Sequence, residues 1–183
     1  AIKDEPMHTL PADGTVDHDY VLMAPKHSGD LTLKATNGDF DPSLTVVHLP
    51  TNIGEDIDLE ADDHLTIIPE LDVGKSGTVT LRAGGGMALG HGIRAGTLDL
   101  EDKGENEDLH LHTEVDNLSV TMGEQSDFIL EQSGDLNISE LKMNGGDVII
   151  HAEADVTIQS ISGELGELHI VSETGDIDID GMQ

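Results

Sequence analysis

A short motif recurs along this chain, and it limits the possible folds more than any other feature of the sequence. It consists of a glycine or polar residue, often followed by aspartate, and then an apolar–polar–apolar triplet. Alternation of apolar and polar residues with period two predicts a β-strand that buries one face. Clear examples begin at Gly29, Gly77, Gly134, Gly146 and Gly175.

The spacing of these strands is regular, and it predicts how they are arranged. The first apolar residues of the motif fall into series with gaps of 18 to 22 residues. These series are Ile57, Val79, Leu98, Leu118, Leu136, Val156 and Ile177; then Leu109, Phe128, Val148 and Leu168; and then Leu141, Ile161 and Met182. A coil that returns to the same lateral position about every 20 residues gives such phased series, whereas a hairpin sandwich does not. The sequence therefore predicts an all-β fold, a right-handed parallel β-helix (β-solenoid) with coils of about 20 residues.

The two ends of the chain differ in regularity. Residues 1–28 hold three prolines and no long run of period-two alternation, so we expect an irregular leader or N-terminal cap there. Residues 29–183 are expected to form the solenoid, which becomes regular from about residue 54. All 6 prolines lie in the first 69 residues, as expected if the later strands donate hydrogen bonds to ladders on both sides.

The charge of the chain excludes several classes of partner. With 38 acidic and 8 basic residues, the formal net charge is −30, so binding to nucleic acid or to an anionic membrane surface is not expected. No run of 18 apolar residues occurs, so we expect no membrane insertion. The chain has no cysteine, which excludes disulfides and thiolate metal sites. The acidity is consistent with solubility, with adaptation to a saline medium, or with attraction of divalent cations.

Two segments resemble repeats of bacterial surface proteins. Residues 77–89, which read GTVTLRAGGGMAL, resemble the repeats of filamentous haemagglutinin-type exoproteins. Residues 162–170 (SGELGELHI) and 175–181 (GDIDIDG) look like the putative-adhesin β-solenoid family. The resemblance covers about residues 54–183, and it implies a right-handed β-helix in an extracellular or cell-surface setting. The Asn-Pro-Asn-Leu secretion motif of the exoproteins is absent.

One outward-facing row of the predicted strands is a candidate interface. His110, Ile129, Ile149 and His169 follow the first inward residue of their strands and are expected to stack in adjacent coils. Two outward isoleucines in adjacent coils indicate either a partner surface or cover by another part of the chain, for which residues 1–28 are one candidate. The sequence leaves both readings open.

Metal binding and catalysis have weaker support. Asp176, Asp178 and Asp180 alternate on the last strand and are candidate calcium ligands, because calcium prefers carboxylate oxygens. The acidic stretch Glu105–Asp108 is explained equally well by loop solvation. We expect no enzymatic activity, because carbohydrate-active β-helices need grooves with aromatic side chains and this chain has only Tyr20, Phe40 and Phe128. No phosphate loop, dinucleotide motif or nucleophile elbow is present.

These observations favour an extracellular structural or adhesive module that forms part of a larger surface protein or assembly. Residues 176–180 read as one more strand that no capping segment covers, so we expect either continuation of the chain or an end-to-end homo-oligomer. A cell-surface glycan or protein is a further candidate partner. Two alternatives stay open: a calcium-dependent, self-assembling filament or surface-layer subunit, and a polysaccharide-active β-helix enzyme.

Overall fold

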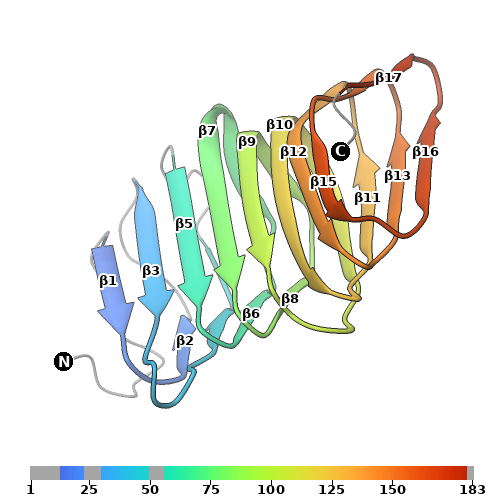
Figure 1. The fold of residues 1–183 in the computed structure, drawn as a ribbon. Coiled ribbons are helices and arrows are strands. Elements are labelled where there is room, and N and C mark those ends of the chain that lie inside the picture. Colours follow the sequence, from blue (N-terminus) through green and yellow to red (C-terminus); the bar gives the residue numbers. More distant parts are fainter. Residues whose placement is uncertain (1–12, 23–29, 50–55, 181–183) are drawn as a thin grey trace.

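The computed structural model of the chain describes residues 13–22, 30–49 and 56–180, and all regular structure in these ranges is β-strand (Figure 1). The strands are β1 (Asp13–Val16), β2 (Tyr20–Leu22), β3 (Leu31–Ala35), β4 (Leu44–Val46), β5 (Asp56–Ala61), β6 (His64–Ile67), β7 (Leu71–Ala83), β8 (Gly86–Leu89), β9 (Ile93–Asp102), β10 (Leu109–Glu124), β11 (Phe128–Gln132), β12 (Leu136–Asn144), β13 (Val148–Ala152), β14 (Val156–Ile158), β15 (Ile161–Glu164), β16 (Leu168–Ser172) and β17 (Ile177–Ile179). The predicted all-β class is thus confirmed.

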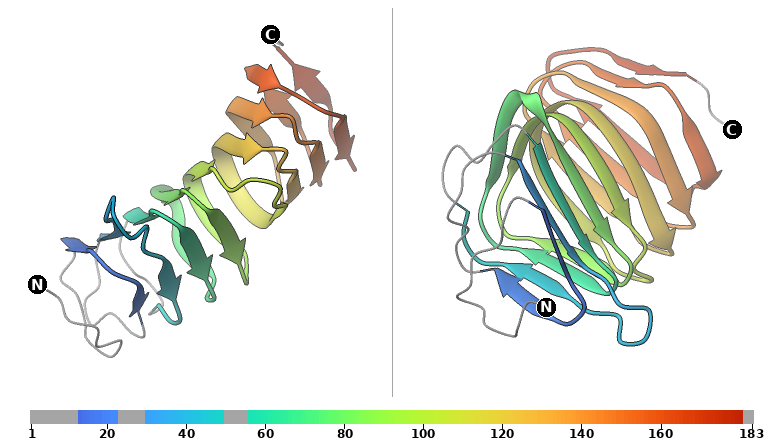
Figure 2. Two further views of the ribbon diagram at one scale, coloured as in Figure 1. Left: turned by 60° about the horizontal axis from the view of Figure 1, so that its bottom comes forward. Right: turned by 90° about the vertical axis from the view of Figure 1, so that its left-hand side faces the viewer.

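The strands wind into a solenoid of about eight turns, because each strand pairs in parallel with its equivalent one coil further on. Figure 2 shows the coils stacked along one axis. Parallel pairing at about 4.8 Å per strand requires a connection that returns to the same side, and one coil of about 20 residues provides it. The parallel β-solenoid with coils of about 20 residues is confirmed, while the right-handed winding stays a prediction.

Each coil has two main faces. The first face contains β1, β3 and β5, the C-terminal parts of β7, β9 and β10, and then β12, β14 and β17. The second face begins with the four-stranded sheet β2–β4–β6–β8 and continues with the N-terminal part of β10, then β11, β13 and β16. The long strands β7, β9 and β10 bend around a corner and so connect the faces.

The registers confirm most of the predicted series. Ile57 pairs with Val79, and the second series, from Leu109 to Leu168, pairs as predicted. The prediction was wrong at one step: Leu118 pairs with Ile138 and not with Leu136. Leu136 and Ile138 both point inward from β12, and a pattern with period two does not show which of them pairs with Leu118. Met182 lies outside the described residues.

The first coil also differs from its prediction. Residues 1–28 were expected to be irregular, yet β1 and β2 lie in this range and pair in parallel with β3 and β4. These two strands are only four and three residues long, too short for a visible alternation in the sequence. Residues 1–12 and 23–28 of the predicted leader lie outside the described residues.

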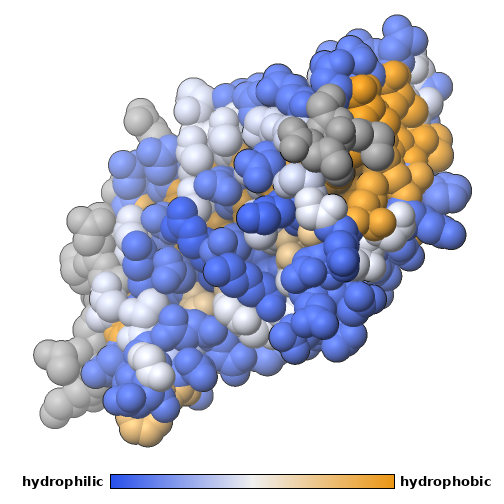
Figure 3. Space-filling model, in the orientation of Figure 1, coloured by the Kyte–Doolittle hydropathy of each residue, from blue (hydrophilic) through white to orange (hydrophobic). Residues whose placement is uncertain are grey.

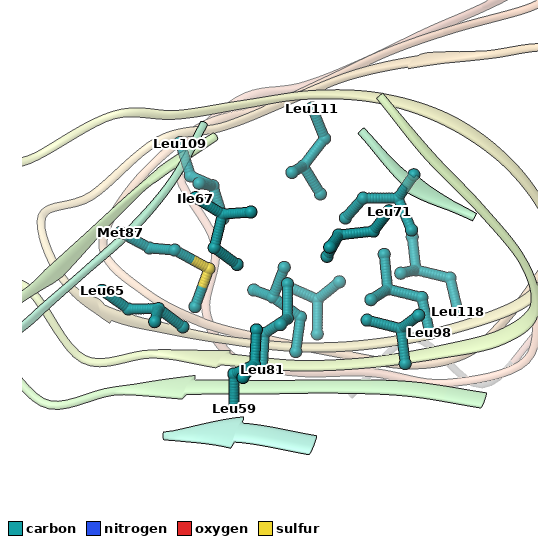
Figure 4. Close-up of a cluster of buried hydrophobic side chains, with 14 of the residues drawn as sticks. Leu59, Leu65, Ile67, Leu71, Leu81, Met87, Leu98, Leu109, Leu111 and Leu118 are labelled. Atoms are coloured by element: carbon teal, nitrogen blue, oxygen red, sulfur yellow. The ribbon is translucent and has the colours of Figure 1, made fainter. Parts of the chain in front are cut away.

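A narrow aliphatic core fills the solenoid. The inward side chains are almost all leucine, isoleucine, valine, methionine or alanine, and Phe128 is the largest that is fully buried. Figure 4 shows how they stack: Leu59 lies beside Leu81 and Leu98 beside Leu118, in register with the paired strands, and residues of the second face meet them from the other side. Large aromatic side chains are not needed, because each layer is only one residue thick and repeats in the next coil.

Aspartates at the start of the strands join consecutive coils. The carboxylate of Asp135 accepts a hydrogen bond from the backbone N–H of Asp155 at 3.0 Å, and Asp155 does the same for Asp176 at 2.8 Å. On the second face, Asp127 accepts from the N–H of Asp147 at 2.8 Å. The aspartate of the sequence motif therefore satisfies a backbone donor at a coil corner, where the strand ladder is interrupted. Part of the acidity of this chain is structural.

Gly146 lies at a corner where two coils come very close, and replacing it should be costly. A Cβ atom at this position would overlap the backbone carbonyl of Ser126 in the coil below. Because a backbone atom cannot move aside as a side chain can, we expect Gly146→Ala to lower the free energy of unfolding by about 3 kcal/mol. Chemical denaturation measures this change. Gly38→Ala is the control, since nothing lies within 4 Å of a Cβ there; equal effects of both substitutions would contradict the close approach.

Candidate functional site

The four predicted interface residues lie together on the second face. His110 pairs with Ile129, Ile129 with Ile149, and Ile149 with His169, so they form one outward row across β10, β11, β13 and β16. The side chain of Ile149 is 44% exposed, which is high for a large apolar residue in the middle of a sheet. The structure therefore brings the four residues together, and their role as an interface stays a prediction.

A second outward row on the same strands carries hydrogen-bonded pairs. His112 Nδ1 lies 2.8 Å from a carboxylate oxygen of Glu131, and His151 Nε2 lies 2.9 Å from one of Glu173. The row ends at Val171, which is 52% exposed. All of these polar side chains are half-exposed, so the pairs orient the histidines and contribute little stability.

Next to these pairs, an open groove of about 510 Å³ runs across successive coils. Its charged lining is mostly acidic: Glu70, Glu114, Glu131, Glu153 and Glu173 face it, together with Arg94 and the two histidines His112 and His151. Among the described residues that line this groove there is no Phe, Tyr or Trp ring on which a sugar could stack. Its carboxylates can accept hydrogen bonds from hydroxyl or ammonium groups.

Arg94 fixes one end of the groove. Its Nε donates to Glu114 at 3.0 Å and its Nη1 donates to Asp72 at 3.3 Å, so Arg94 links three coils. These two carboxylates raise the pKa of the Arg94 guanidinium above its ordinary value, with Glu114 the larger cause. The arginine therefore stays charged and holds two acidic side chains in place.

The interior holds an unexpected acid at another corner. Asp102 points inward at the end of β9, in the ladder position occupied by Ala83 and Met122 in the adjacent coils, and is 2% exposed. Burial raises the pKa of its carboxyl to about 6, although a hydrogen bond from the N–H of Gly104 at 2.9 Å opposes the rise. Loss of hydration in an apolar layer disfavours the charged form.

His64 and Glu107 lie on the outer side of that corner. His64 Nδ1 is 3.0 Å from Asp63, and its Nε2 is 3.7 Å from Glu107. The hydrogen bond to Asp63 is the main cause that raises the pKa of the His64 imidazole, and Glu107 adds to it.

The three candidate calcium ligands lie in and beside the last strand. Asp176, Asp178 and Asp180 are all exposed, Asp176 donates its N–H to Asp155, and Asp180 donates its N–H to the carbonyl of Ile158. Within the described parts of the chain, no three His, Asp or Glu side chains are arranged to hold a metal ion. Calcium binding at these aspartates stays a prediction.

Several of these features could not be predicted from the sequence. Arg94 and the groove acids come from different coils, and only the known register shows that they line one groove. Gln132 is buried at 3% exposure and bonds to Thr113 Oγ1, the carbonyl of Val115 and the carbonyl of Asp135. The interior position of Asp102 could have been found, because Leu98, Leu100 and Asp102 continue one period-two run.

Comparisons with protein families, with curated proteins and with solved structures find no match to this chain. Among the residues that the structure describes, no helix could cross a membrane.

Proposed function

We propose that this chain is a structural or adhesive module of the cell exterior, a stiff rod of stacked coils that spaces or displays other parts of a larger surface protein. The observation that carries the proposal is the parallel ladder, which joins coil to coil through all the described ranges. Such a scaffold resists bending, because backbone hydrogen bonds, aliphatic layers and aspartate bonds all run along its axis.

The last described coil supports a join to a further coil. Ile177 and Ile179 of β17 continue the inward ladder from Val156 and Ile158, yet are 43% and 37% exposed. Apolar atoms gather at this end of the molecule (Figure 3). No described residue donates to the carboxylate of Asp176, whereas the equivalent Asp155 accepts from the next coil. A further coil, from the same chain or from a second copy, would complete these layers.

The extracellular setting is supported by the resemblance of residues 77–89 and 162–181 to surface β-solenoid repeats and by the scarcity of cationic groups. In this setting the acidic groove offers hydroxyl-binding carboxylates to a cell-surface glycan or protein. Labelling intact cells with an antibody against this solenoid tests the location. We expect surface staining without permeabilisation; staining only after permeabilisation would refute the proposal.

The calcium-dependent assembly subunit is the second candidate, and it draws support from the exposed acidic residues around β17. It demands that calcium bind the folded chain more tightly than the unfolded chain. Thermal unfolding with millimolar calcium, and with magnesium as the control, tests it. An unchanged midpoint would count against this candidate and leave the structural role in place.

A polysaccharide-active enzyme is the third candidate, and the groove is its only support. The carboxylates there, such as Glu114 and Glu153, could act as acid and base, but no stacking ring accompanies them. A screen for depolymerisation of acidic and neutral glycans tests this candidate, and any turnover lost in Glu114→Gln would replace our proposal.

A further inference from the structure

The second face carries an outward stripe without carboxylates, in a molecule that is otherwise strongly acidic. In the four-stranded sheet the stripe consists of Val21, Thr45, Thr66 and Ala88, and on β10, β11, β13 and β16 it consists of His110, Ile129, Ile149 and His169. On the first face the outward residues include Asp58, Glu60, Asp99 and Glu101. With a formal charge of −30, two copies approach each other most easily where such charges are few.

The order of residues along this stripe is symmetric. Read across the coils, the row is histidine, isoleucine, isoleucine, histidine. A two-fold axis that is parallel to the strands and passes between β11 and β13 maps the row onto itself. It places Ile129 against the partner's Ile149 and His110 against the partner's His169. A surface that complements itself in this way is what an isologous dimer requires.

The second row on these strands is complementary under the same symmetry. It reads His112, Glu131, His151 and Val171. The axis therefore places Glu131 opposite the partner's His151, and this contact occurs twice in the dimer. His112 meets the partner's Val171, the most exposed apolar side chain of β16. The same two-fold axis therefore brings together both the histidine–glutamate pairs and the apolar side chains.

From this geometry we propose that a second copy of the chain packs face to face on β10, β11, β13 and β16, with the two rods antiparallel. The isoleucines form the centre of the interface and the histidine–glutamate contacts flank them. This lateral contact is independent of any join at the last coil, since it uses the side of the rod and not its end.

The size and the rim of the patch determine how strong the dimer is. Four strands cover only about 20 Å by 15 Å, less than the roughly 800 Å² per partner of stable complexes, so we expect association at high micromolar concentration. At the rim, Asp127 and Asp147 occupy equivalent positions in adjacent coils, so Asp127 would face the partner's Asp147 and the two would repel. Screening by salt weakens such repulsion, so added salt should strengthen the dimer.

Analytical ultracentrifugation of the full chain from about 5 to about 500 µM tests the proposal. We expect a monomer–dimer equilibrium that shifts toward dimer in about 0.5 M NaCl, and Ile149→Glu should weaken it at least tenfold. Ile68→Glu is a matched control, because Ile68 is also 44% exposed but lies outside the four strands. Circular dichroism confirms that the variants fold, which is expected because both side chains point outward.

Cross-linking tests the relative orientation of the two rods. Because the sequence contains no cysteine, only the introduced cysteines can react. A short bis-maleimide should join His110→Cys to His169→Cys in a mixture, and join neither variant to itself. Self-joining of each variant would mean parallel rods and overturn the proposal. A wild-type chain that stays monomeric at every concentration of protein and salt would also overturn it. Association that survives Ile149→Glu but is abolished by Ile177→Asp would overturn it too, because the contact would then lie at the end of the rod.

Discussion

Replacing Leu136 with aspartate is expected to unfold the solenoid. Leu136 is 2% exposed and stacks under Val156 in the aliphatic layer of the first face. The carboxylate would lie in this layer with no cation beside it, at a cost of more than about 4 kcal/mol. Since most domains are stable by only about 5–15 kcal/mol, we expect loss of the β-sheet circular dichroism signal at 25 °C.

The neighbouring position provides the control. Asn137 is adjacent in β12 but points outward, where it bonds to Asn117 at 3.1 Å. Asn137→Asp introduces the same side chain into the other face of the strand, and we expect it to change stability by less than about 1 kcal/mol. A folded Leu136→Asp, or similar losses for both variants, would refute the inward assignment of Leu136.

Asp102→Asn is expected to stabilise the protein at neutral pH, by an amount that depends on pH. The buried carboxyl has its pKa raised from 3.8 to about 6, so the folded state binds this proton more tightly than the unfolded state does. Its contribution to stability is greatest below pH 3.8 and is lost as the pH rises through about 6. A difference of about two pH units corresponds to about 3 kcal/mol. Asparagine cannot ionise, and its oxygen can still accept from Gly104.

Urea denaturation of wild type and variant between pH 4 and pH 8 measures this difference. We expect similar stabilities near pH 4 and an advantage of up to about 3 kcal/mol for Asp102→Asn above pH 7. Asp99→Asn removes the same charge from an exposed position of β9 and so controls for the overall charge; its effect should stay below about 0.5 kcal/mol. An effect of Asp102→Asn that is constant with pH would disprove the buried charge.

The sequence was sufficient to predict the fold because the solenoid is built from local repetition. Inward residues such as Phe128 and Val148 recur at a fixed interval, and the motif glycines indicate the corners, so strand, spacing and stacking could be read together. The same logic placed His110, Ile129, Ile149 and His169 in one row, although none of them belongs to a known motif.

Other features of the fold and of the groove could not be predicted from the repeat of about 20 residues. The pairing of Leu118 with Ile138 depends on which of two inward residues of β12 continues the ladder, and an alternating pattern does not show this. The irregularity that follows at Ser139 shifts the register by one residue and is equally invisible in the pattern. The groove, with Glu114 bonded to Arg94, is found only when side chains from several coils are placed in space. Strands β1 and β2 were not predicted, because pairing with the strands of the next coil holds them in place and their own sequence pattern does not indicate a strand.

The aspartate bonds between coils have a consequence for how such a chain can change in length. Asp135 accepts from the N–H of Asp155, and Asp155 accepts from the N–H of Asp176 one coil further on, so the last described coils repeat the same junction. Duplicating or deleting one whole coil in this part of the chain leaves the remaining junctions chemically unchanged, whereas inserting a few residues disrupts them. The length of the rod can therefore change during evolution in steps of one coil, without a change in the contacts that hold the coils together.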